Sequence, residues 1–115
     1  MDKRIAENLN KLFNSYDLFS SSGVEKNRSK MRNEIPDITD AEIKEVDEYL
    51  QEFYDFCSVY GRKIAEKYKL SHLPYTEEAR KEVAEYTYIC RERFPEVDEM
   101  HIRELFSTVC CMINR

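Results

Sequence analysis

The apolar residues between positions 38 and 70 recur at alternating steps of three and four residues. They are Ile43, Val46, Leu50, Phe53, Cys57, Tyr60 and Ile64. This spacing keeps one side of an α-helix apolar over about six turns, because residues three and four apart share a helix face. The spacing therefore predicts a long helix over residues 39–69.

The residues before this helix predict where it begins. Thr39 can cap the first turn, and Glu42 can reach back to the Thr39 backbone and close a capping box. Ile38 and Ile43 occupy the two positions of a hydrophobic staple. Aromatic residues also flank the apolar seam: Tyr49, Tyr54, Phe56 and Tyr68. Because its apolar face is so wide, we expect this helix to contact several neighbours at the centre of a bundle.

Apolar stripes of the same period predict three further helices, over residues 2–20, 76–94 and 98–114. The chain has only two glycines and three prolines, too few for the turns of an all-β domain. We therefore predict an all-α fold, a four-helix bundle-like single domain over residues 1–115, in which the long second helix is central. Its predicted core is Leu9, Leu12, Phe13, Val46, Leu50, Phe53, Cys57, Tyr60, Ile64, Val83, Tyr86, Cys90, Leu105, Phe106 and Val109.

Residues 23–36 show no clear apolar stripe. Lys26, Arg28, Lys30 and Arg32 alternate with other residues, several of which have poor strand propensity. Pro36 biases the residue before it away from helical conformation. The segment is predicted to be a basic linker with room for one helical turn.

Composition excludes several classes of protein. The net charge of −5 argues against binding driven by nucleic-acid phosphates, and no apolar run approaches the ~20 residues that span a bilayer. No secretion signal is visible, so we expect a cytoplasmic protein with reduced thiols at its four cysteines. These are Cys57, Cys90, Cys110 and Cys111. They lack the paired spacing of zinc ligands.

The residues that could carry catalysis do not assemble into a known pattern. The fragment Asp98-x-x-His101 approximates only one of the two Glu-x-x-His motifs of a di-iron bundle. His72 lies in a predicted loop, and His101 is more than two turns from Cys110 on the same helix, so no nucleophile is paired with a base. Neither glycine belongs to a phosphate-binding loop. We therefore predict no enzyme activity, no metal and no cofactor.

Acidic residues dominate the start of the long helix. Glu45, Glu48, Glu52 and Asp55 recur at 3-4-3 spacing on the side opposite the apolar seam, where like charges repel. Three interpretations remain open. The stripe could be a solvated face, it could pair with a folded-back Lys26–Arg32 segment, or it could dock on a basic partner. Tyr88 and Tyr75, which lie off the apolar stripes, are further candidates for a partner-binding surface.

The sequence favours a non-catalytic protein that binds another protein through its acidic stripe. In general character it resembles small acidic inhibitors of phage or mobile elements, such as anti-CRISPR proteins, and also toxin or bacteriocin immunity proteins. The resemblance to inhibitors implies that Glu45, Glu48, Glu52 and Asp55 dock on a partner's basic surface. An alternative is a DNA-binding or transcription-associated regulator that uses Lys26, Arg28, Lys30 and Arg32. The formation of a homodimer, in which a second copy completes the apolar seam, is a further possibility. The net negative charge disfavours a nucleic-acid partner, and no association with a membrane is expected.

Overall fold

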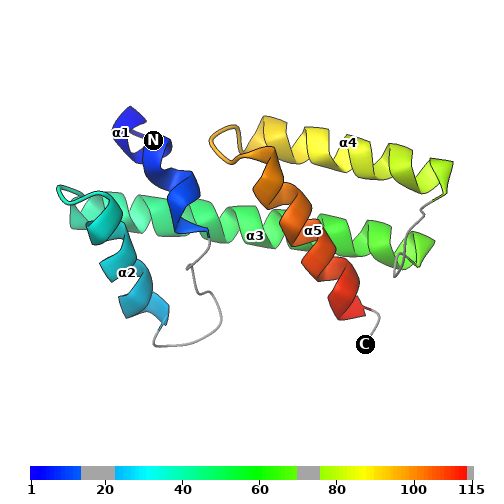
Figure 1. Ribbon diagram of the computed structural model, residues 1–115, viewed down its shortest axis with the longest axis horizontal. Helices are drawn as coiled ribbons and strands as arrows, with labels where there is room; N and C mark the ends of the chain where they lie inside the picture. The colour runs from blue at the N-terminus through cyan, green and yellow to red at the C-terminus, as the bar shows by residue number, and fades with distance from the viewer. Residues whose placement is uncertain (14–22, 70–75, 114–115) are drawn as a thin grey trace. The chain divides into compact units, whose positions relative to one another are not determined.

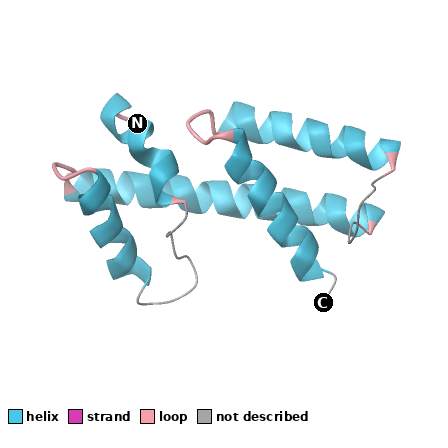
Figure 2. Ribbon diagram, viewed as in Figure 1, coloured by secondary structure: helices cyan, strands magenta, loops and turns pink. Residues whose placement is uncertain are grey.

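The computed structural model describes residues 1–13, 23–69 and 76–113. Within these ranges the chain forms five α-helices and one short 3₁₀ helix, and no β-strand (Figure 2). The prediction of an all-α, bundle-like fold built on a long helix is confirmed. The prediction of a single domain stays a prediction.

In the C-terminal two thirds of the chain, the observed helices agree closely with those predicted from the sequence. The elements are α1 (Lys3–Leu9), η1 (Asn10–Leu12), α2 (Gly23–Glu34), α3 (Asp40–Tyr68), α4 (Glu77–Arg93) and α5 (Glu99–Ile113) (Figure 1). The last three agree with the predicted ranges to within one residue at each described end. The helix predicted over residues 2–20 instead ends as an α-helix at Leu9 and tightens into η1, and residues 14–20 lie outside the described part of the chain.

The described residues form two compact units, Met1–Glu52 and Phe53–Arg115, and α3 contributes to both. The first unit contains α1, η1, α2 and the first turns of α3. Its buried apolar side chains are Ile5, Leu9, Leu12, Met31, Ile35, Ile38, Ile43, Val46 and Leu50. Asp2 caps α1, because its side chain accepts a hydrogen bond of 2.8 Å from the Arg4 backbone N–H.

The prediction of a linker over residues 23–36 is wrong for residues 23–34, which form helix α2. Asn27, Met31 and Ile35 are spaced four residues apart, all three are buried, and α2 packs against η1. Because Asn27 is polar, the buried face of this segment contains only two apolar residues, Met31 and Ile35, from which a helix could have been predicted. Tertiary packing of this face stabilises a helix whose own sequence is weakly amphipathic.

The second unit contains the rest of α3 with α4 and α5, and aromatic side chains dominate its core. The Tyr86 ring lies 5.0 Å from Tyr60 and 5.2 Å from Phe106 between centroids. Phe53 and Phe94 meet edge to face at 5.4 Å. Such edge-to-face contacts suit aromatic quadrupoles, so the rings hold the three helices in a defined arrangement. Among the predicted core residues Phe13, Tyr60, Val83 and Leu105 are half-buried, and the others are buried.

Gly61 lets the helices of the second unit approach closely. A β-carbon at this position would lie 3.2 Å from Phe106 Cδ2 and 3.3 Å from Tyr86 Oη. Both neighbours are buried, so a side chain at residue 61 would displace them. The sequence left open whether this glycine bends the long helix or permits close packing, and the structure shows close packing.

The predicted start of α4 is confirmed. The Thr76 hydroxyl accepts a hydrogen bond of 3.2 Å from the Ala79 N–H, and Glu77 and Glu78 lie in the first turn, where the helix dipole favours negative charge. In the turn before α5, Val97 and Ile102 are both buried, as a hydrophobic staple requires.

Candidate functional site

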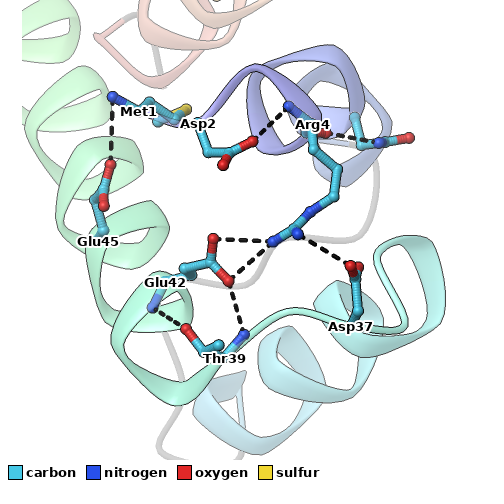
Figure 3. Close-up of polar contacts among 8 residues, drawn as sticks. Met1, Asp2, Arg4, Asp37, Thr39, Glu42 and Glu45 are labelled. Carbon is cyan, nitrogen blue, oxygen red and sulfur yellow. Dashed lines mark hydrogen bonds and ion pairs between the residues drawn. The ribbon is translucent and has the colours of Figure 1, made fainter.

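Arg4 offsets much of the negative charge at the start of α3. Its guanidinium donates to Asp37 Oδ2 at 3.0 Å and to both carboxylate oxygens of Glu42 at 2.9 Å (Figure 3). Arg32 of α2 donates to Asp40 at 3.1 Å. In Arg4 a single nitrogen, Nη2, contacts both oxygens of Glu42 while Nη1 binds Asp37, so the guanidinium bridges two carboxylates through charge-assisted hydrogen bonds. Arg4 and Arg32 therefore neutralise carboxylates around the start of α3, but they pair with none of the four stripe residues.

Glu42 also closes the predicted capping box. Its Oε1 accepts a hydrogen bond of 3.0 Å from the Thr39 N–H, and the Thr39 hydroxyl accepts one of 3.1 Å from the Glu42 N–H (Figure 3). The backbone hydrogen bond from Thr39 lowers the pKa of the Glu42 carboxyl; partial burial opposes this, and the Thr39 side chain and Arg4 add to the lowering. Glu42 is thus a structural carboxylate rather than part of an exposed binding surface.

We expect Glu42 to make stability depend on pH in the acid range. Because its pKa is lower in the folded protein than its ordinary value of 4.5, its contribution is complete above that value and is lost as the pH falls through the folded pKa. Glu42→Gln should therefore be less stable than the wild type at neutral pH, and the gap should shrink on acidification. Urea unfolding at a series of pH values from neutral to strongly acidic measures the gap.

The control for this series is Glu48→Gln. Glu48 is exposed, and its pair with Lys44 spans 4.0 Å, so its removal should change stability little at any pH. A gap between the wild type and Glu42→Gln that stays constant down to the most acidic sample would contradict the assignment.

All four residues of the predicted stripe are exposed. Glu45, Glu48 and Glu52, hereafter the acidic face, follow one another on α3 in the first unit. Glu45 Oε1 lies 3.5 Å from the Met1 nitrogen, and Glu52 forms no ion pair with any residue that the structure describes. Asp55 is likewise exposed on α3 but belongs to the second unit.

The Lys26–Arg32 segment does not lie along the stripe as one interpretation required. Within the described ranges none of its side chains pairs with Glu45, Glu48, Glu52 or Asp55; Arg32 reaches Asp40, and Lys30 pairs with Glu34 of its own helix at 3.2 Å. On an α-helix Lys26 and Lys30 share one side, and Arg28 and Arg32 share the opposite side. The four bases therefore do not form a single basic face for DNA.

Tyr88 is confirmed as an exposed residue, with 64% of its surface accessible. It lies on a groove of about 460 Å³ between α4 and α5, which arginines of both helices also line. The sequence prediction missed these arginines, which are Arg80, Arg91 and Arg103. The spacing of Arg80, Ala84, Thr87 and Arg91 on one side of α4 was the available signal. Tyr75, the other predicted tyrosine, lies outside the described residues.

The cysteines and histidines show no accessible catalytic pairing in the described ranges. All four thiols are free in the structure, and Cys57 donates a hydrogen bond to Cys90 at 3.1 Å. This bond raises the pKa of Cys57, aided by burial, and lowers that of Cys90, which accepts it. Both side chains are fully buried, so neither is presented to a substrate. His101 is buried on α5, and His72 lies outside the described residues.

Across residues 1–13, 23–69 and 76–113, His, Cys, Asp and Glu side chains form no group of three that could hold a metal ion. The helices in these ranges include none that is both long enough and apolar enough to cross a membrane. Comparison of the chain with known protein families, with curated proteins and with solved structures gave no match. Its function must therefore be argued from its own surfaces.

Proposed function

We propose that this protein acts without catalysis, in the cytoplasm, by binding another protein. Its acidic face would dock on a basic surface of that partner, as a small inhibitor of the phage or mobile-element type does. The observation that carries the proposal is that the acidic face stays exposed although the first unit neutralises neighbouring carboxylates with Arg4 and Arg32. Electrostatic complementarity of this kind speeds encounter and selects partners.

The carboxylates of the acidic face are better suited to docking a partner than to pairing with cations of this protein. Glu48 and Glu52 have few contacts with cations in the first unit, and Glu52 has no ion pair among described residues, so their charge is available to an incoming cation. Repeated carboxylates on a rigid helix present a fixed spacing, which favours a partner whose Lys or Arg residues match that spacing. A protein that binds nucleic acid in a basic groove is one such partner.

The test is charge reversal of the acidic face. The triple variant Glu45→Lys, Glu48→Lys and Glu52→Lys should bind the partner at least about tenfold more weakly, because like charges then face each other across the interface. The wild-type chain, immobilised and exposed to a lysate of its native host, provides the partner, and titration of that purified partner measures the affinity.

A matched control separates the position of the charges from their number. Glu66, Glu78 and Glu85 are exposed carboxylates of the second unit, and their reversal to Lys changes the net charge by the same amount. This control should keep its affinity. Equal binding by wild type and the acidic-face variant would refute the proposal. The DNA-binding alternative would instead appear as salt-sensitive binding to duplex DNA that is lost when Lys26, Arg28, Lys30 and Arg32 are replaced.

A further inference from the structure

The groove between α4 and α5 is basic, although the chain as a whole carries a net charge of −5. Three arginines line it against one acidic residue, Glu99. Glu99 forms an ion pair with Arg103 at 3.0 Å and accepts a hydrogen bond from Arg91 at 3.4 Å, each through a different carboxylate oxygen. Arg80 is exposed and forms no ion pair with any described residue. Among its arginines, the groove thus has one that is available to a ligand, Arg80, and two that share the carboxylate of Glu99.

The rest of the lining combines apolar and aromatic side chains with two hydroxyl residues, Thr87 and Ser107. Val83, Ala84 and Phe106 contribute carbon surface, and Tyr88 stands beside them with most of its side chain exposed. Tyrosine and arginine are the residues that carry most binding energy at protein interfaces, because they combine large contact area with hydrogen bonding. A ligand that fits this lining needs both an apolar group and anionic groups.

The spacing of the arginines indicates the size of the ligand. Arg80 and Arg91 are eleven residues apart on α4, which corresponds to about 16 Å along the helix. The first and fifth residues of an extended peptide are about 13 Å apart, since each residue adds about 3.3 Å, and the long side chains of arginine and glutamate can cover the remaining ~3 Å. Two carboxylates separated by such a span, with an apolar side chain between them, would match the arginines and the apolar lining together.

We propose that this groove binds an acidic peptide segment of a partner protein. One carboxylate of the segment pairs with Arg80, and another takes the place of Glu99 on Arg91 and Arg103. The apolar side chain between them packs against Val83, Phe106 and Tyr88. Guanidinium groups favour this exchange because they bind carboxylates through paired hydrogen bonds. The proposal concerns the second unit alone and does not depend on the acidic face.

The test measures binding of a fluorescein-labelled peptide, Glu-Ser-Leu-Ser-Glu, to the full chain by fluorescence anisotropy. The matched peptide Gln-Ser-Leu-Ser-Gln should bind at least about fivefold more weakly, because it lacks the carboxylates. Arg80→Gln combined with Arg103→Gln should weaken binding of the acidic peptide by about tenfold. As a control, Arg62→Gln combined with Lys63→Gln removes two exposed cations of α3 that do not line the groove, and binding should be unchanged.

The most discriminating variant is Glu99→Gln. Because Glu99 competes with the incoming carboxylate, its neutralisation should tighten peptide binding about threefold or more, whereas a purely structural Glu99 would leave the affinity unchanged or weaken it. Circular dichroism establishes that each variant is folded. Equal affinity for the two peptides, or no gain in Glu99→Gln, would overturn the proposal. So would stronger binding of a single-stranded oligonucleotide that responds to the same substitutions, or sedimentation showing that a second copy of the chain occupies the groove.

Discussion

Tyr86→Ala is expected to lower the free energy of unfolding by about 3–5 kcal/mol, the usual range for removal of a large buried ring. The Tyr86 side chain has no exposed surface, and its ring packs between Tyr60 and Phe106. Its hydroxyl donates a hydrogen bond of 3.0 Å to the Cys57 carbonyl on α3. Truncation therefore leaves a cavity where α3, α4 and α5 meet. Urea unfolding followed by circular dichroism measures the loss.

One companion variant separates the contribution of the ring from that of the hydroxyl, and a second serves as an exposed control. Tyr86→Phe keeps the ring and removes one buried hydrogen bond, so it should cost about 1 kcal/mol. Tyr88→Ala removes an exposed tyrosine from the same helix and should change stability by no more than about 0.5 kcal/mol. If Tyr86→Ala and Tyr88→Ala had similar costs, the packing described for the second unit would be wrong.

Met31→Ala is expected to cost about 2–5 kcal/mol. Met31 is 1% exposed on the face of α2 that also buries Asn27, and Ile35, just after the helix, is buried as well. A residue in a solvated linker would instead change stability by no more than about 0.5 kcal/mol when truncated. The variant thus distinguishes the helix of the structure from the linker predicted by the sequence. Thermal and urea unfolding both provide the measurement.

The control for Met31 is Arg28→Ala, since Arg28 is exposed on the same helix and alanine preserves helix propensity. It should leave stability within about 0.5 kcal/mol of the wild type. Amide hydrogen exchange gives a second measurement: protection at residues 27–34 is expected in the wild type and should fall in Met31→Ala. Rapid exchange of this segment in the wild-type protein would contradict the assignment of α2.

Local signals allowed α3, α4 and α5 to be predicted almost to their ends. The seam from Ile43 to Ile64 sets a helical period, and Thr39 and Thr76 provide hydroxyl groups where the first turns need hydrogen-bond acceptors. Each of these interactions joins residues within four positions of each other or along one helix face. Such interactions depend only on the order of residues, so a single sequence is enough to identify them.

The helix α2 was missed because its local signals are weak. Alternating charges obscure its two apolar anchors, and the third residue of its buried face, Asn27, is polar. A short helix of this kind is marginal alone and forms because packing against η1 stabilises it. The early end of α1 at Leu9 was missed for the opposite reason, because the apolar stripe of the sequence continues past that residue.

By itself the sequence determined the helical class, the long central helix and its acidic stripe, because these depend on contacts close together along the chain. Only the tertiary structure decided which charges remain exposed. Arg4 reaches Asp37 and Glu42, residues 33 and 38 positions away, and leaves the acidic face uncovered. Likewise, Arg80, Arg91 and Arg103 line one groove because α4 packs on α5. Charge complementarity and groove shape arise when distant segments pack together, and no local pattern specifies that packing.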